Sequence, residues 1–258
     1  LTASNITPYT ADLSWIENGS ATTWNIEYGA TGFTQGTGTT VAATSNPFTL
    51  TGLSSATTYD VYIQADCGGT GSSTWLGPIT FTTECAPITS LQWNEGVESI
   101  TTAGEFPLCW AHTGGTTYWS TGITSTTNNR YAHSGTKYFT CRYGASDLLY
   151  TPGFILTAGT SYDFSFWYIT DGYSGWNNLA TLVGTSQALA GITDTLSIIT
   201  SPINTTYQQV TVSFIPATTD TFYFSVYVGA STAPMYMTFD DFRLIETPTC
   251  TEPSGLTA

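Results

Sequence analysis

Apolar and polar residues alternate along most of the chain, which is the pattern of β-strands with one buried face. In residues 1–84 the alternating runs are short, evenly spaced and separated by turn residues, so they predict a β-sandwich. The residues predicted to face its core are Leu13 and Trp15 in ADLSWIE, Trp24, Ile26 and Tyr28 in TWNIEYG, and Tyr59, Val61 and Ile63 in TTYDVYIQ.

From about residue 91 the predicted strands are longer and richer in aromatic residues, and they fall at 162–169, 208–215, 221–228 and 235–245. No stretch of ten or more residues combines helical periodicity with helix-forming composition. The chain is therefore predicted to be all-β, with one domain at 1–84, a second at 85–247 and the start of a further domain at 248–258.

Composition narrows the class of protein. Apolar residues make up 41% of the chain, which is enough for packed cores, whereas only 9% of residues are charged and 53 are threonine. The net charge is −14, with Lys137 as the only lysine beside Arg130, Arg142 and Arg243. This balance argues against nucleic acid and anionic membranes as partners, because both require a cationic surface. No run of eighteen apolar residues occurs, so no bilayer-spanning segment or membrane insertion is predicted.

Residues 1–84 resemble a fibronectin type III domain. The resemblance is carried by Trp15 in the second strand, Trp24 and Tyr28 in the third, and Leu53 six residues before Tyr59. The last pair matches the tyrosine corner, in which the phenol bonds back to the backbone just upstream. The segments GFTQGTGTTV, DCGG and FTTECAP are similar to those of secreted proteins from Bacteroidetes-type bacteria.

Residues 85–247 resemble the jelly-roll domains grouped as MAM-like, cleaved-adhesin or choice-of-anchor J domains. The motifs are, in order, NEGVESITTAGEFPLCW, SDLLYTPGFIL, YDFSFWY and FDDFRL, with Val97 at a position where the family usually has phenylalanine. Together the two resemblances imply a fibronectin type III sandwich followed by a jelly-roll sandwich.

The jelly-roll resemblance implies a calcium site at four acidic residues, Glu95 and Glu98 near the first strand and Asp240 and Asp241 in the last. First and last strands of such sandwiches are commonly neighbours. Successive residues of a strand point to opposite faces, so Asp240 and Asp241 can reach one ion only across a β-bulge. In the alternative, Asp241 pairs with Arg243 and no ion binds.

The sequence offers little for catalysis. No Gly-x-Ser-x-Gly elbow, His-Glu-x-x-His helix or phosphate-binding glycine loop occurs. Cys109 or Cys141 could pair with His112 or His133 as a nucleophile, but disulfide-bonded or buried cysteines are the favoured interpretation. A carboxylate pair drawn from polar loops lacks the apolar surroundings that raise the pKa of a catalytic acid. We predict that the chain is not an enzyme.

The five cysteines are an odd number, which in a secreted protein predicts a partner outside the fragment. The first three residues, Leu-Thr-Ala, recur as residues 256–258, so we interpret the chain as one 255-residue unit of a tandem repeat. Cys67 would then pair with the preceding unit's equivalent of Cys250. Cys85 is predicted to bond to Cys109, leaving Cys141 as a buried thiol, and a Cys109–Cys141 bond is the rival.

Aromatic residues in glycine-rich loops are candidates for carbohydrate binding. Tyr173 and Trp176 lie in TDGYSGWNN, and Tyr118 and Trp119 lie in GGTTYWS. Loops at the end of a sandwich often carry binding residues, although rings folded onto the core are the simpler explanation.

These observations predict a non-catalytic repeat unit of a large secreted or cell-surface adhesin or stalk that serves attachment, gliding or cell contact. Its partners would be neighbouring repeats of the same chain and glycans or other surface polymers, with avidity supplied by repetition. Two alternatives stay open, a carbohydrate-binding accessory region of a secreted hydrolase and a subunit of a self-assembling extracellular filament.

Overall fold

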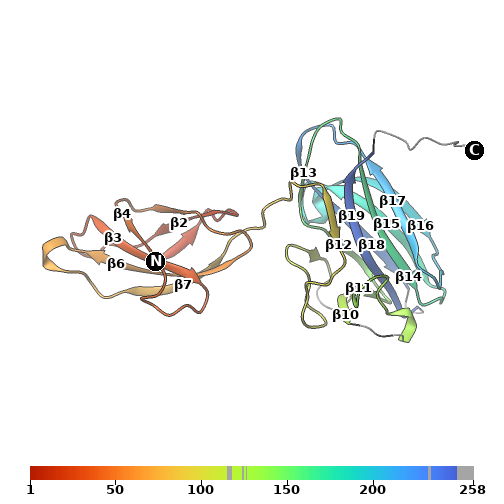
Figure 1. The fold of residues 1–258 in the computed structure, drawn as a ribbon, viewed down its shortest axis with the longest axis horizontal. Helices are drawn as coiled ribbons and strands as arrows, with labels where there is room; N and C mark the ends of the chain where they lie inside the picture. The colour runs from red at the N-terminus through yellow and green to blue at the C-terminus, as the bar shows by residue number, and fades with distance from the viewer. Residues whose placement is uncertain (115–117, 124, 126, 232–233, 249–258) are drawn as a thin grey trace, which may run out of the picture. The chain divides into compact units, whose positions relative to one another are not determined.

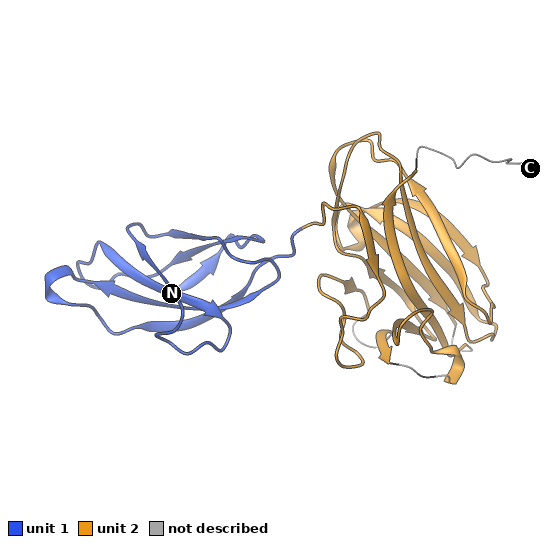
Figure 2. Cartoon of the chain, in the orientation of Figure 1, with its two compact units in different colours: residues 1–86 blue, residues 87–258 orange. Residues whose placement is uncertain are grey.

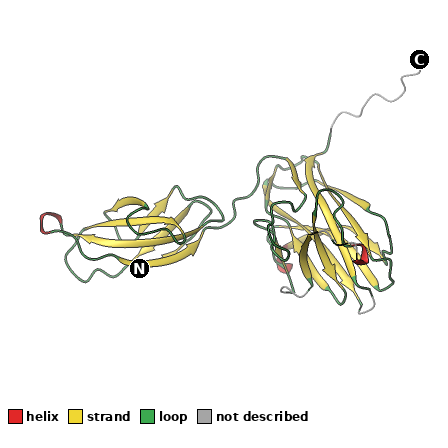
Figure 3. Ribbon diagram, turned by 60° about the horizontal axis from the view of Figure 1, so that its bottom comes forward, coloured by secondary structure: helices red, strands yellow, loops and turns green. Residues whose placement is uncertain are grey.

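The computed structural model describes residues 1–114, 118–123, 125, 127–231 and 234–248. The chain divides into two compact units, residues 1–86 and 87–258, with the division close to the expected boundary at residue 84 (Figure 2). Strands and loops make up nearly all of the described chain, and the few helical segments are short (Figure 3). None of the described helices is long and apolar enough to cross a bilayer. The expected domain start at residues 248–258 lies almost wholly outside the described residues.

The first unit is a sandwich of two antiparallel sheets (Figure 1). One sheet has the order β1-β2-β5 and the other the order β4-β3-β6-β7. The strands are β1 (Thr2–Ser4), β2 (Thr10–Ser14), β3 (Thr23–Ala30), β4 (Thr39–Ala43), β5 (Phe48–Thr51), β6 (Thr58–Asp66) and β7 (Leu76–Thr82).

The alternation read from the sequence places the core of the first unit correctly. Leu13, Ile26 and Val61 are fully buried, and Trp24 and Tyr59 are nearly so. The tyrosine corner is also confirmed, because the backbone N–H of Ser54 donates a hydrogen bond to the Tyr59 hydroxyl at 2.9 Å.

The second unit is a larger sandwich of two six-stranded antiparallel sheets. The predicted all-β fold class, a fibronectin type III sandwich followed by a jelly roll, is therefore confirmed. The first sheet, named sheet D here, has the order β10-β11-β19-β14-β17, with β8 also pairing with β19. The second has the order β16-β15-β18-β12-β9, with β13 also pairing with β18. The strands of sheet D are β8 (Gln92–Glu95), β10 (Trp119–Ile123), β11 (Lys137–Arg142), β14 (Tyr162–Thr170), β17 (Gln208–Phe214) and β19 (Tyr236–Glu246). Those of the second sheet are β9 (Ala111–His112), β12 (Ser146–Tyr150), β13 (Phe154–Leu156), β15 (Trp176–Gly184), β16 (Ile192–Thr200) and β18 (Asp220–Ala230).

Aromatic rings fill the space between these two sheets. In β14 the residues at even positions, from Tyr162 to Tyr168, point inward and are buried. In β18, Phe222, Phe224, Val226 and Val228 are buried as their alternation predicts. The rings of Phe164 and Phe224 stack across the sandwich with centroids 4.4 Å apart. A tightly packed aromatic core of this kind holds sheet D rigid beneath the residues on its outer surface.

A second tyrosine corner lies in the second unit. The backbone N–H of Thr157 donates to the Tyr162 hydroxyl at 2.9 Å, which repeats the Ser54–Tyr59 bond of the first unit. The sequence carries the signal twice, as Leu53 six residues before Tyr59 and as Leu156 six residues before Tyr162. The two sandwiches therefore share one device for fixing the entry into a central strand.

Candidate functional site

The candidate site lies on the outer face of sheet D. Because successive side chains of a strand alternate, the inward rings of β14 place Ser165 and Trp167 on the outside. Gln209 of β17 pairs directly with Trp167, and Arg243 of β19 pairs with Ser165. Asn94 of β8 in turn pairs with Arg243. Directly paired residues have Cβ atoms about 4.5–5.5 Å apart, so these five form one continuous polar surface around an indole.

A hollow of about 240 Å³ opens on this surface. It is lined by an indole, two carboxamides, a hydroxyl, a guanidinium and carboxylates, from Trp167, Asn94, Gln209, Ser165, Arg243, Asp241 and Glu95, with Gly96 and Phe242 between them. These groups offer both donors and acceptors beside one aromatic ring. A saccharide, which has hydroxyl groups on its rim and C–H groups on its faces, matches such a lining. We name this hollow the Trp167 hollow.

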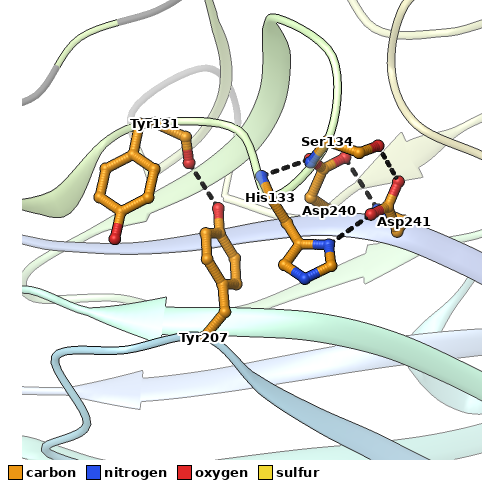
Figure 4. A network of polar contacts seen from close by, with 6 residues as sticks. All are labelled: Tyr131, His133, Ser134, Tyr207, Asp240 and Asp241. Atoms are coloured by element: carbon orange, nitrogen blue, oxygen red, sulfur yellow. Dashed lines mark hydrogen bonds and ion pairs between the residues drawn. The ribbon is translucent and has the colours of Figure 1, made fainter.

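The carboxylates beside the Trp167 hollow are held by a β-bulge. The pairing of β14 with β19 shifts register between Ser165 and Trp167, and Asp241 has the left-handed φ of +48°. The bulge lets Asp240 and Asp241 turn toward the same loop, as Figure 4 shows. The bulge that would let neighbouring aspartates act together is thus present in the structure.

The loop before β11 closes over these two aspartates. The N–H groups of His133 and Ser134 donate to Asp240 Oδ2 at 2.7 and 3.0 Å, and the N–H of Asp241 donates to Asp240 Oδ1 at 2.8 Å. The Ser134 hydroxyl donates to Asp241 Oδ1 at 2.6 Å, and His133 Nδ1 lies 2.6 Å from Asp241 Oδ2 (Figure 4). The expected alternative pairing of Asp241 with Arg243 is therefore wrong, since the histidine takes that place.

Burial controls the protonation of Asp240, which has no exposed surface. Burial raises the pKa of Asp240 to about 7. The neighbouring Asp241 charge also raises this pKa, whereas the three backbone N–H donors lower it. Burial likewise raises the pKa of Tyr207, whose hydroxyl donates to the Tyr131 carbonyl (Figure 4).

An aromatic stack joins the loop to the sheet. The His133 ring lies parallel to the Trp167 indole, with centroids 4.1 Å apart and planes 13° apart, and Tyr207 meets the His133 ring edge-on at 5.0 Å. One face of Trp167 is therefore covered by protein. The half-buried indole forms one wall of the hollow.

The four residues predicted to bind calcium occupy three separate hydrogen-bonding arrangements. Asp240 and Asp241 hold the 133–134 loop, Glu98 accepts hydrogen bonds from the N–H groups of Thr136 and Lys137, and Glu95 accepts one from the N–H of Val97. Burial raises the pKa of Glu95. The predicted pairing of the first and last jelly-roll strands is confirmed, because Glu95 of β8 pairs with Phe242 of β19.

As they stand, these carboxylates do not fit a calcium site. Calcium takes six to eight oxygen ligands around one point. In the described part of the chain, no three His, Cys, Asp or Glu side chains are grouped so that they could hold a metal ion. The calcium site stays a prediction from the family resemblance.

The four aromatic residues predicted to bind glycans do not gather in one place. Trp119 is fully buried against Phe239, and Trp176 is 1% exposed, with its indole N–H donating to Asp171. Both begin strands and point into the core, so the expectation that they form an exposed platform is wrong. Tyr173 is exposed on its loop. Tyr118 lines a second hollow on sheet D.

The sequence contains a signal for Trp167, although the predicted set of binding aromatics does not include it. In YDFSFWYI the inward positions are Tyr162, Phe164, Phe166 and Tyr168, so the one tryptophan of this strand must face outward. The polar neighbours of Trp167 come from three other strands. Only the pairing of those strands brings them together.

The cysteines separate into two kinds. Cys85 and Cys109 are disulfide-bonded, which indicates an oxidising environment. Cys141 is a free, fully buried thiol, so the rival Cys109–Cys141 bond is contradicted, and burial raises its pKa well above the usual value. Neither Cys109 nor Cys141 can supply a thiolate nucleophile. Cys67 is an exposed free thiol, and Cys250 lies outside the described residues.

All three arginines lie on the sheet D side of the second unit. Arg243 lines the Trp167 hollow, and Arg130 and Arg142 line the second hollow. Among the described residues the one ion pair is His133–Asp241, so none of the arginines is paired with a carboxylate. The remaining cation, Lys137, donates to the carbonyls of Glu98 and Ile100. In a chain with a net charge of −14, the available positive charge is thus concentrated beside one sheet.

Comparison with known proteins gives one family match. The fibronectin type III domain model matches residues 1–82. No curated protein matches the chain.

Solved structures resemble the chain distantly. The K1 cleaved adhesin domain of Lys-gingipain from Porphyromonas gingivalis W83 is 15% identical, with a TM-score of 0.45, over 62% of this chain and all of that domain. The K2 cleaved adhesin domain of Lys-gingipain is 18% identical, with a TM-score of 0.46, over 60% of this chain and 98% of that one. The CBM22-1 xylan-binding domain from Paenibacillus barcinonensis Xyn10C is 12% identical, with a TM-score of 0.42, over 64% of this chain and all of that domain.

Proposed function

We propose that this chain, whose residues 1–82 match the fibronectin type III model, is a non-catalytic adhesion module of a secreted or cell-surface protein. In this proposal the first unit is a spacer and the second binds a polysaccharide on the outer face of sheet D. One observation carries the proposal: the three unpaired arginines, two hollows and an outward tryptophan all lie on that side of the unit.

The way in which buried carboxylates are satisfied supports a binding role for the arginines. Buried Glu27 accepts hydrogen bonds from the N–H groups of Gly36 and Gly38, and buried Asp240 accepts them from the 133–134 loop. Neither carboxylate is neutralised by a cation. Because the fold does not use its arginines for internal charge pairing, their placement beside the hollows is free to serve an external ligand.

A polysaccharide is the ligand that this lining fits best. Sugar recognition requires several hydrogen bonds to hydroxyl groups beside an aromatic wall, and the Trp167 hollow provides carboxamides, a hydroxyl and a guanidinium around one indole. Weak binding at one such hollow is sufficient for adhesion when the module is presented in several copies, since multivalency raises the overall affinity.

Screening against immobilised neutral and acidic polysaccharides tests the proposal. The chain should bind at least one glycan, and Trp167→Ala together with Arg243→Gln should reduce the affinity about tenfold or more, the loss expected for a stacking wall and a charge-assisted hydrogen bond. Tyr173→Ala, which removes an exposed ring from a loop of the same unit, is the matched control and should leave binding unchanged. Binding that depends on Tyr173 and not on Trp167 would contradict the proposal.

A further inference from the structure

A second hollow, of about 380 Å³, lies on sheet D where β10, β11 and β19 run side by side. Its volume falls within the roughly 300–1,000 Å³ of typical ligand pockets. The lining includes three tyrosines and two arginines, together with small polar residues, and none of its described residues is an aspartate or glutamate; the tyrosines and arginines are Tyr118, Tyr138, Tyr236, Arg130 and Arg142. We name it the arginine hollow.

Both arginines neighbour Tyr236, although the Arg142 guanidinium lies over the ring of Tyr143, with its Cζ 4.9 Å from that centroid. Arg130 lies over the Tyr236 ring, with its Cζ 4.1 Å from the ring centroid, and Arg142 is the residue directly paired with Tyr236 across the sheet. Two like charges that line one hollow repel each other unless an anion lies between or beside them. The chain has eighteen acidic residues, yet none of those described in the structure lines the hollow.

Within the described part of the chain, most of the donors of these two arginines have no hydrogen-bond partner. Arg130 Nε donates to the Thr127 carbonyl at 3.1 Å, and one terminal nitrogen of Arg142 donates to the Tyr143 hydroxyl at 3.3 Å. The Nε of Arg142 is buried and has no hydrogen-bond partner among the residues that the structure describes. Each guanidinium carries five N–H donors in a planar fork that suits the two oxygens of a carboxylate.

The tyrosines surround this positive centre with rings and hydroxyl groups. The Tyr138 ring lies across Gly122, where an added Cβ would come within 2.3 Å of the ring, so the glycine is what permits this placement. Burial raises the pKa of Tyr138 although the Arg130 charge lowers it, so the phenol remains a neutral donor and acceptor at neutral pH.

We infer that the arginine hollow binds the carboxylate of a uronic acid residue in an acidic polysaccharide. The guanidinium groups of Arg130 and Arg142 take the carboxylate, while the tyrosines contact the sugar ring and its hydroxyl groups. That the ligand is a saccharide rests on the proposed function. That it carries a carboxylate rests on the two arginines.

A matched pair of ligands tests this inference by calorimetric titration of the whole chain. Trigalacturonate and its methyl ester differ in charge but not in sugar skeleton. The chain should bind the acid at least tenfold more tightly than the ester, and added salt should narrow the difference. Arg130→Gln and Arg142→Gln should each reduce binding of the acid about tenfold to a hundredfold, the range for losing a hydrogen bond to a charged group.

Two further variants separate charge from geometry and location. Arg142→Lys keeps the charge but loses the planar fork, so it should retain only part of the preference for the acid. Tyr173→Ala removes an exposed ring that does not line the arginine hollow and is the control, since it should leave the preference for the acid unchanged. Unfolding curves identical to those of the unchanged chain establish that each variant is folded.

The outcomes distinguish this inference from the proposed function. If neutral glycans bind but acid and ester bind equally, or if the glutamine variants keep the preference, the inference is overturned and the proposed function stands. If acetate displaces trigalacturonate as well as glucuronate does, the anion site stands without its sugar specificity, and the saccharide part is overturned. Failure of the unchanged chain to bind any saccharide overturns both.

Discussion

The two units of the chain share a fold type and a structural device but differ in where they place positive charge. Each is an antiparallel sandwich, and each fixes a central strand with a tyrosine that accepts a backbone N–H at 2.9 Å. The first unit contains no lysine or arginine, whereas the second contains all four lysine and arginine residues of the chain, and three of them line the two hollows of sheet D. The tyrosine corner is therefore common to both sandwiches, whereas lysine and arginine residues are present in only one of them.

The first unit shows that such a sandwich requires no cation. Its buried Asp60 accepts hydrogen bonds from the N–H of Gly32 and the hydroxyl of Thr80. These hydrogen bonds lower the pKa of Asp60 by more than burial raises it. Threonine hydroxyl and backbone N–H groups are therefore enough to stabilise internal carboxylates. In the proposal above, the arginines of the second unit serve an external ligand.

The largest expected effect is a difference in unfolding free energy between a core variant and a surface variant of the second unit. Trp119→Ala should lower the free energy of unfolding by about 3–5 kcal/mol, because it leaves a cavity in a packed aromatic core. Tyr173→Ala should change it by less than ~0.5 kcal/mol, since that ring is exposed. Chemical denaturation followed by tryptophan fluorescence measures both. A stable Trp119→Ala variant that had lost glycan binding would reinstate Trp119 as a ligand-binding residue.

The next effect is a dependence of stability on pH that arises from Asp240. Its neighbours are Asp241, His133 and Tyr207. A carboxyl whose folded pKa is about 7, against about 3.9 when unfolded, holds its proton more tightly in the folded state. Its contribution to stability is therefore complete below about pH 4 and is lost as the pH rises toward 7. Unfolding curves between pH 4 and 8 should show this loss. Asp240→Asn should remove it, and an unchanged profile in that variant would assign the loss to another group.

The two tyrosine corners should then respond alike. Tyr59→Phe and Tyr162→Phe each remove the oxygen that accepts an N–H, and each should cost about 1–2 kcal/mol of unfolding free energy. The measurement is denaturant unfolding of each variant, with Tyr9→Phe as the control for an exposed phenol. A cost at Tyr59 without one at Tyr162 would show that the two bonds are not equivalent.

Calcium should have the smallest effect. Because the oxygens of Glu95, Glu98, Asp240 and Asp241 already accept hydrogen bonds from the protein, we expect little difference in unfolding temperature between millimolar calcium and a chelator. A clear rise with calcium that Asp240→Asn abolishes would support the site implied by the family resemblance, and the loop at residues 133–136 would then have to rearrange.

The sequence predicts strands and their inward residues well, because alternation is a local property. Leu13, Phe224 and Val226 could be assigned to a core from their neighbours alone. The site is different, because it depends on which strands pair. Asn94, Arg243 and Gln209 lie far apart in the chain and meet only through β8, β19, β14 and β17. Trp119 and Trp176 were misassigned because the glycine-rich segments before them suggested loops, whereas both residues begin strands.

The central claim is that the second unit binds its ligand on the outer face of sheet D. The most direct test is a titration of the isotopically labelled chain with its best-binding saccharide, followed by two-dimensional NMR of the backbone amides. Shifts should be largest in β10, β11, β14, β17 and β19 and absent from the first unit. Shifts concentrated in β15, β16 and β18, or in the first unit, would contradict the account.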